Sequence, residues 1–517
     1  MRARGDAIFF VSVALGIALV ALALVPYRSI EFVARDEAVY AVFAQRAQHG
    51  AVCFRDFWDV HFPGLYYVYA WAFEWSARAG DGAKPMEAVR TLHLLTQAGV
   101  LALFGGLARS VAGAWAASLA VAALACAAIS PAFEGATANT EPFALLFVCA
   151  GLWLARAELA PRVRDLAAGA LIALGSLFKQ NAAFFLVVPI LADGRRGWAR
   201  APWLFAGWLV PNLIVGLSFA RVGAFDEMLE QTVLFPLLRR AGGVGAEEAI
   251  RGALSLVGIL VHGHPALAAG GVAAVALAVA LAISPAVSPT PRAGRWIVAF
   301  LAVGLAVSFA GLRSLGHYLQ FAAPALALAL GWAVVRLSAE PIARAGALAL
   351  TALLAVDVGE TVLRTASAYV GEYTPTTEHP RWREAEVGEY VKSRTGPSDS
   401  ILVWGPKPAV FYYADRPAPG RFYGLYPLVG PNTGRRAQMD IPGAMDELRA
   451  SLESSPPRYV VLAPTLANYA LDQAQFVWLQ RWIDERYLIE ATIGAVSYTH
   501  LRAHETKANL VCRLLLE

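Results

Sequence analysis

The stretch AIFFVSVALGIALVALALV, from Ala7 to Val25, carries no charged side chain and could cross a lipid bilayer as one helix. An α-helix rises about 1.5 Å per residue and the hydrocarbon layer is about 30 Å thick, so about 20 apolar residues suffice for a crossing. Runs of similar length and composition recur along the first 360 positions. The sequence therefore predicts a polytopic α-helical membrane protein, not a barrel of strands.

The same criterion places ten further spans, which gives about eleven transmembrane helices. They lie near residues 90–108, 112–130, 140–155, 166–177, 181–191, 202–220, 266–284, 295–311, 316–336 and 343–359. Because the basic N-terminus MRAR precedes the first run, that run fits either a membrane anchor or a secretory signal.

The composition supports this class of protein and argues against others. Hydrophobic residues make up 57% of the chain and charged residues 16%, a balance that no soluble domain of this size needs. The net charge is only +4, so the sequence gives no support for nucleic-acid binding. The cysteines form no CxxC pair, so neither a disulfide framework nor a metal-thiolate site is predicted. They are Cys53, Cys126, Cys149 and Cys512.

The loop charges predict the topology, because cytoplasmic loops of membrane proteins are enriched in Lys and Arg. With a cytoplasmic N-terminus, the loops on that side carry Arg156, Arg162, Arg164, Arg195, Arg196, Arg200, Arg292, Arg295, Arg336 and Arg344. The opposite loops carry Asp36, Glu37, Asp56, Asp59, Glu134, Glu141, Asp226 and Glu227. We predict a multi-pass protein of a cell membrane, in bacteria the inner membrane, with an extracytoplasmic C-terminal domain.

Three regions follow from these changes in composition. Residues 1–360 form the transmembrane region and include a large first outer loop, 26–90. Residues 361–495 are predicted to be a soluble α/β domain, with helices near 382–394 and 474–485 and strands at ILVWG, FYYAD and YVVLAP. Residues 496–517 look like a translated sequencing adapter, so we interpret them as a non-native tail and expect the natural sequence to be interrupted near Ala495.

The first outer loop concentrates acids beside the membrane. Asp36 and Glu37 begin a predicted amphipathic helix, where adjacent side chains point about 100° apart and serve different partners. A carboxylate here is suited to take a proton from a hydroxyl as that oxygen attacks an activated sugar carbon. Helix capping by these acids is the structural alternative.

Asp59 and His61 lie just before Pro63 and the aromatic segment LYYVYAWAFEW, whose composition is typical of the bilayer interface. The chemical interpretation of His61 is phosphate binding or proton transfer. The alternative is a solvated histidine without a function.

Basic and polar residues stand at the outer ends of later spans. Lys179 lies in GSLFKQNAAFF, and Arg313, His317 and Tyr318 lie in GLRSLGHYLQFAAP. Cations at these positions would offset the charge that builds up on a departing phosphate, whereas snorkelling to headgroups is the alternative role. Glu141 either caps the following span or lines the same outer cavity.

Five motifs carry a resemblance to a known family. In order along the chain, they are RDEAVY, DFWDVHFPGLYYVYAWAF, ANTEP, LFKQNAAFFLVVP and GHYLQFAAP. Together they resemble the GT-C-type glycosyltransferases, in particular bacterial relatives of protein O-mannosyltransferases and lipid A aminoarabinose transferases. The resemblance covers residues 35–330, and each motif alone is weak.

The resemblance implies a polyprenyl-phosphate sugar donor, an inverting transfer on the extracytoplasmic side, and Asp36 as catalytic base with Glu37 as its supporting acid. It leaves a divalent metal cofactor open. The acceptor would be an envelope lipid, glycan or protein. At His61 and Phe62 the chain departs from the family pattern, in which many relatives show a lysine and a proline.

Two other functions compete with this one. A multispan transporter would place charges near the bilayer midplane, whereas here they gather at span ends. A non-enzymatic envelope assembly protein would need far fewer anchors than eleven.

Overall fold

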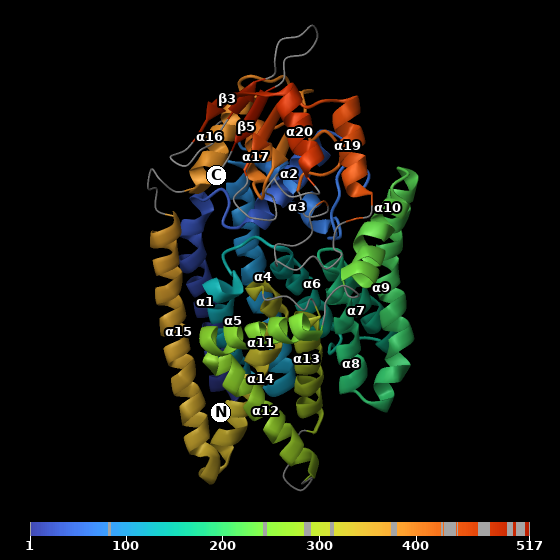
Figure 1. Cartoon of the computed structure of the whole chain (residues 1–517). Coiled ribbons are helices and arrows are strands. Elements are labelled where there is room, and N and C mark those ends of the chain that lie inside the picture. Colours follow the sequence, from blue (N-terminus) through green and yellow to red (C-terminus); the bar gives the residue numbers. More distant parts are fainter. Residues whose placement is uncertain are drawn as a thin grey trace.

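The computed structural model describes residues 2–80, 84–240, 246–283, 291–310, 315–373, 380–424, 428, 441, 443–463, 476–493, 500–502 and 512–515. Long helices form an elongated bundle, and strands and shorter helices cover one end of it (Figure 1).

Each predicted apolar run overlaps a helix of the bundle, although the helix bounds differ from the predicted ones. The segments are α1 (Arg2–Leu24), α4 (Pro85–Ala112), α5 (Ala114–Ile129), α6 (Thr140–Leu154), α7 (Pro161–Ser176), α8 (Val187–Ala192), α9 (Arg195–Arg221), α12 (Pro265–Ile283), α13 (Pro291–Phe309), α14 (Ala323–Ala339) and α15 (Arg344–Tyr373). Large apolar side chains such as Val272 and Leu22 are exposed on their outer surface, which is the arrangement expected of a lipid-facing bundle.

The number of crossings is not confirmed as eleven. Among the described residues, five helices are long and apolar enough to span a bilayer, and a bent pair raises this number to six. Four apolar segments are shorter, because some predicted spans begin as tight 3-10 turns. Residues 180–186 form η3 before α8, and residues 316–321 form η6 before α14. The chain is therefore a multi-pass membrane protein in which several apolar helices have only 10 to 17 residues.

The bent pair was not predicted. α11 (Ala246–Gly263) meets α12 at an angle of 108°, with His264 at the break. Charged residues in the first turns of α11 hide its apolar face from a search for uniformly apolar runs. Between α9 and α11 the chain forms α10 (Phe225–Leu229) and a π-helical segment η4 (Glu230–Arg240).

The first outer loop folds into two helices at the same end as the C-terminal strands (Figure 1). They are α2 (Arg35–Gln48) and α3 (Gly64–Arg78). At the start of α3, the backbone N–H of Gly64 donates to the carbonyl of Leu177 at 3.0 Å. A Cβ atom on Gly64 would lie 2.7 Å from that oxygen, so this contact requires glycine.

The C-terminal region contains a five-stranded sheet in the order β1-β2-β5-β3-β4. Its strands are β1 (Ile401–Trp404), β2 (Tyr459–Leu462), β3 (Leu488–Thr492), β4 (His500–Arg502) and β5 (Cys512–Leu515). The helices of this region are α16 (Pro380–Lys392), α17 (Ala409–Ala414), α19 (Ala444–Ser454) and α20 (Val477–Arg486). Strands β4 and β5 lie in residues 496–517. That these residues are a non-native tail stays a prediction.

The prediction of a strand at FYYAD is wrong, because residues 411–414 lie in α17. Aromatic side chains favour strands only where a pleated surface receives them. Here Val410, Phe411 and Tyr412 are buried among neighbouring side chains on successive positions, and helix α16 packs alongside. Tertiary packing outweighs the local preference.

The C-terminal region is fastened to the first outer loop by polar contacts. Arg46 of α2 forms an ion pair with Asp415, and the backbone N–H of Trp58 donates to the carbonyl of Arg421 at 2.9 Å. Tyr413 donates to Glu31 at 3.0 Å. The C-terminal region therefore contacts the loop that follows α1 directly.

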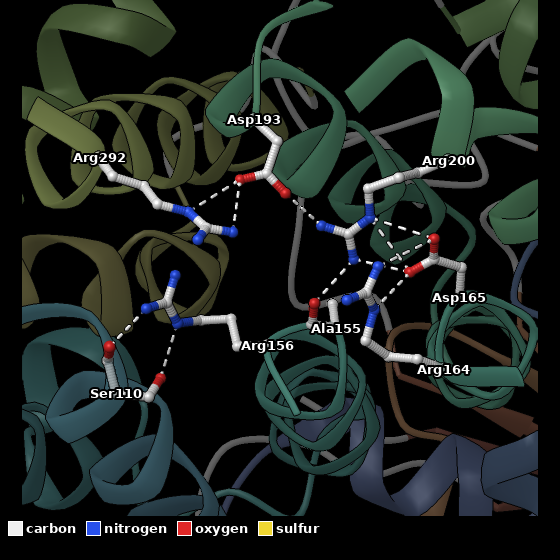
Figure 2. A network of polar contacts seen from close by, with 8 residues as sticks. All are labelled: Ser110, Ala155, Arg156, Arg164, Asp165, Asp193, Arg200 and Arg292. Atoms are coloured by element: carbon white, nitrogen blue, oxygen red, sulfur yellow. Dashed lines mark hydrogen bonds and ion pairs between the residues drawn. The ribbon is translucent and has the colours of Figure 1, made fainter. Parts of the chain in front are cut away.

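A polar network joins the loop between α8 and α9 to the beginnings of α9 and α13 (Figure 2). Asp193 accepts hydrogen bonds from Arg200 at 2.5 Å and Arg292 at 3.2 Å, and Asp165 accepts from Arg200 at 2.8 Å. Near these groups, Arg156 donates to the Ser110 hydroxyl at 2.8 Å. The arginines of this network come from the loops that the charge pattern predicts to be cytoplasmic.

Candidate functional site

The two adjacent acids of the first outer loop have different surroundings. Glu37 is fully buried and forms a bidentate ion pair with Arg90 of α4. Its oxygens also accept hydrogen bonds from the backbone N–H groups of Val33 at 2.7 Å, Ala34 at 3.2 Å and Ala138 at 2.6 Å. Glu37 thus caps α2 and joins it to α4, so the capping alternative describes this acid.

Asp36 is only partly buried, and no described residue forms a hydrogen bond or ion pair with its carboxylate. It precedes Tyr40 by one helical turn, so the two side chains lie on the same face of α2. Burial raises the pKa of Tyr40 well above its ordinary value, and the negative charges of Asp36, Asp59 and Glu141 raise it further. Three acids therefore act electrostatically on one buried phenol.

Asp59 and His61 form a hydrogen-bonded pair beside that phenol. The Asp59 carboxylate lies 2.9 Å from His61 Nδ1 and accepts a hydrogen bond from the Tyr66 hydroxyl at 2.6 Å. Burial opposes ionisation of Asp59, but His61 and these hydrogen bonds hold its pKa below the ordinary value. The rings of His61 and Tyr40 meet edge to face at 5.7 Å. His61 is therefore oriented by Asp59 and is not a freely solvated histidine.

A buried group of ionisable residues lies near the hydroxyl of Tyr40. This hydroxyl donates to Asn139 at 3.0 Å, and Asn139 caps α6 just before Glu141. Glu141 is fully buried and forms an ion pair with Lys179, which also lies 4.4 Å above the Tyr318 ring. Lys179 is 8% exposed, so it does not snorkel to the surface.

His317 completes this group. Its Nδ1 lies 2.9 Å from Glu134, and its Nε2 lies 3.9 Å from Glu141. His317 thus lies between two carboxylates. Glu134 has a backbone φ of 55°, a left-handed conformation that is uncommon for residues other than glycine. Such strain is often found at functional sites.

Most of the residues that the sequence nominated are thus close to one another. The charges of Asp36, Asp59 and Glu141 all act on Tyr40. Lys179 and His317 approach Glu141, and Tyr318 lies against Lys179. Glu37 is held by Arg90 and backbone N–H groups. Arg313 lies outside the described residues.

Sequence reasoning missed several members of the site. Arg90 begins a predicted span and reads as an interfacial charge. Tyr40, Tyr66 and Asn139 are common types of core and cap residue, and their roles depend on partners from distant segments: the hydroxyl of Tyr40 reaches Asn139, 99 positions away. Glu134 belonged to the acidic outer loops, but its pairing with His317 had no local signal.

Asp36 and Glu37 do not together offer two free carboxylates to a divalent metal. Both oxygens of Glu37 are occupied by Arg90 and backbone N–H groups, which leaves Asp36 without a second carboxylate beside it. In the part of the chain that the structure describes, the group of His, Cys and Asp residues close enough to hold a metal lies elsewhere, at Cys126, His264 and Asp357.

Comparison by sequence finds no matching family model and no match among the curated proteins. Comparison by structure finds ArnT from Cupriavidus metallidurans in the apo state, with a TM-score of 0.56 and 16% identity over 95% of this chain and 97% of that chain. ArnT bound to undecaprenyl phosphate gives a TM-score of 0.55 and 16% identity over 79% and 85% of the two chains.

The archaeal oligosaccharyltransferase AglB from Archaeoglobus fulgidus, in complex with an inhibitory peptide and a dolichol-phosphate, gives a TM-score of 0.57. Its identity is 11%, over 95% of this chain and 75% of that chain. These neighbours are GT-C-type membrane glycosyltransferases. The chain therefore shares the fold of the GT-C-type glycosyltransferases, which the motifs of the outer loops had suggested.

Proposed function

We propose that this protein is an inverting membrane glycosyltransferase that moves a sugar from a polyprenyl-phosphate donor to a hydroxyl of an envelope lipid, glycan or protein. The acceptor oxygen attacks the anomeric carbon and loses its proton to Asp36. The bond from that carbon to the phosphate oxygen breaks, and the phosphate leaves with the electron pair. Attack opposite the leaving group inverts the configuration.

The state of Asp36 carries this proposal. A general base must keep a lone pair free for the proton that it takes. Glu37 has none to spare, because Arg90 and three backbone N–H groups occupy its oxygens. Asp36, on the neighbouring position, is partly buried and meets no hydrogen-bond donor among the described residues. We therefore assign the base to Asp36 and a supporting role to Glu37.

Lys179 and His317 are suited to receive the donor phosphate. An ammonium group has three N–H donors, and the ion pair of Lys179 with Glu141 leaves donors for a second acceptor. His317 lies beside the carboxylates of Glu134 and Glu141, and both of its ring nitrogens are donors when it is protonated. Hydrogen bonds from these cations would strengthen as negative charge builds up on the leaving phosphate. Arg313 belongs to the same proposal through its place in the sequence.

We further propose that the site faces the extracytoplasmic side and that residues 361–495 form an α/β domain there. The N-terminus lies at the end of the bundle away from the C-terminal strands (Figure 1). The Asp6–Arg109 ion pair, at 2.8 Å, joins the N-terminal segment to the end of α4 on that side. Both features agree with the charge rule for cytoplasmic loops.

The test compares Asp36→Asn with the wild type in nanodiscs, using a panel of undecaprenyl-phosphate sugars and measuring released undecaprenyl phosphate. Asparagine keeps the shape and removes the base, so we expect turnover to fall by about 100-fold or more, the usual contribution of general base catalysis. Binding of undecaprenyl phosphate alone should be retained. Glu74→Gln is the matched control, because Glu74 is an exposed acid of the same outer loop.

Undiminished turnover by Asp36→Asn, at equal protein abundance, would refute the assignment of the base. Absence of turnover and of undecaprenyl phosphate binding in the wild type would refute the glycosyltransferase proposal itself.

A further inference from the structure

A second polar cluster lies inside the bundle, away from the proposed catalytic site. Cys126 comes from α5, His264 from the break between α11 and α12, and Asp357 from α15. One donor atom from each residue lies within 4.8 Å of the other two, and all three residues are buried. His264 Nδ1 is 3.1 Å from Asp357 Oδ1 and 4.0 Å from Cys126 Sγ.

We propose that Cys126, His264 and Asp357 bind a Zn²⁺ ion that fixes the bend between α11 and α12. Thiolate, imidazole and carboxylate are the three protein ligands that zinc prefers. Usual zinc–ligand bonds place tetrahedral ligand atoms about 3.3 to 3.6 Å apart. The two distances from His264 Nδ1 lie on either side of this range, so a small movement of the Cys126 side chain would complete the geometry.

The charge balance of the cluster fits its surroundings. A thiolate and a carboxylate together cancel the charge of Zn²⁺, and His264 would bind as a neutral imidazole. A neutral centre avoids the large cost of placing a net charge among apolar side chains. The competing structure is a metal-free ion pair between His264 and Asp357 with Cys126 as a thiol.

One ring nitrogen of His264 is directed at the other two proposed ligands. Its Nδ1 faces Cys126 and Asp357, whereas its Nε2 is buried without a hydrogen-bond partner among the described residues. The other side of the ring packs edge to face on Phe133 at 4.6 Å. A fourth ligand, water or the hydroxyl of Thr361 at 3.5 Å from Asp357 Oδ1, would complete the coordination.

The location gives the ion a structural role. The three ligands join helices that are far apart in sequence at a point where the chain bends by 108°. The short turn η2 (Pro131–Phe133) packs on this bend, since a Cβ atom on Gly263 would lie 2.9 Å from Ala132. The same turn leads into Glu134, the partner of His317. The ion would therefore stabilise the segment that carries Glu134, next to the proposed catalytic site, without touching substrate.

The experiment measures metal content in full-length protein that carries a tag without histidine. Protein in nanodiscs is loaded with Zn²⁺, dialysed, and analysed by inductively coupled plasma mass spectrometry. We expect one Zn²⁺ per chain in the wild type and at least a tenfold loss in Cys126→Ser and Asp357→Asn. Cys149→Ser is the matched control, because Cys149 is a buried free cysteine in α6 and should leave the zinc content unchanged.

Co²⁺ provides a second readout that does not depend on activity or on large changes in stability. The thiolate-to-cobalt absorption band should appear in the wild type and in Cys149→Ser, and should be missing from Cys126→Ser. Zn²⁺ should also raise the Tm of the wild type but not that of Asp357→Asn. Wild-type protein that holds no zinc, or Cys126→Ser protein that keeps it, would overturn the proposal in favour of the metal-free ion pair.

Discussion

Glu37 and Asp36 are adjacent, but they differ in their hydrogen bonds. The carboxylate of Glu37 is fully hydrogen-bonded and has a structural role, whereas that of Asp36 has no partner among the described residues and is proposed to act in the reaction. Glu37 neutralises Arg90, which is only 3% exposed. Removing one partner of a buried ion pair leaves an uncompensated charge and typically costs about 3 to 5 kcal/mol. Asp36 has no such partner among the described residues, so its substitution should leave the fold intact.

We therefore expect Glu37→Gln to lower the Tm of the purified protein clearly, whereas Asp36→Asn keeps the wild-type Tm and loses turnover. Differential scanning fluorimetry in detergent provides both values. A wild-type Tm for Glu37→Gln would show that Arg90 does not depend on this carboxylate.

His317 predicts an effect on stability. It is buried, its Nδ1 lies 2.9 Å from Glu134, and its Nε2 lies 3.9 Å from Glu141. Because His317→Gln removes the imidazole that contacts these two carboxylates, we expect it to lower the stability by about 1 to 3 kcal/mol. Differential scanning fluorimetry measures the corresponding fall in Tm.

The control is His49→Gln, because His49 is an exposed histidine of the outer loop whose Nδ1 lies 3.7 Å from Asp415. This variant should keep the wild-type Tm. An equal Tm for His317→Gln and the wild type would contradict the prediction.

At the scale of elements, α2 is held between the bundle and the C-terminal region. Arg46 is 6% exposed and depends on Asp415, the residue that follows α17. We expect Asp415→Asn to cost about 1 to 3 kcal/mol, since a buried charged donor loses its ionised partner. Faster hydrogen exchange in α17 and α2, measured by mass spectrometry, would report the loosened contact.

Glu453→Gln is the reference variant, because Glu453 forms an exposed ion pair one turn apart on α19 and should be nearly neutral. Unchanged exchange in Asp415→Asn would indicate that the apolar contacts alone hold α17 on α2.

The sequence predicted elements better than their contacts. Apolar runs such as 202–220 mark helices because a bilayer demands length and uniform composition, and YVVL became β2 because all four residues are buried. FYYAD failed because packing against α16 decided its conformation. The pairing of Lys179 with Glu141 could not be read from one sequence, because no local rule brings residues 38 positions apart together.

At the scale of the whole molecule, the topology makes a labelling prediction. We expect two exposed positions, Ser393 in the C-terminal region and Ala160 before α7, to lie on opposite sides of the membrane. The reporters are single-cysteine proteins that carry Ser393→Cys or Ala160→Cys. A membrane-impermeant maleimide added to intact spheroplasts should label the first and spare the second. Lysed cells supply the control, in which both react. Labelling of Ala160→Cys in intact spheroplasts would reverse the proposed orientation.

The network in Figure 2 restricts how this bundle can admit a lipid from the side. Asp193 binds Arg200 of α9 and Arg292 of α13, so parting these helices at this end would separate charges that are now paired. Entry of an isoprenoid tail should instead pivot the helices about that end. Spin labels at Arg221 and Leu315 should then move apart when undecaprenyl phosphate is added, while a pair at Arg196 and Arg295 stays at constant distance.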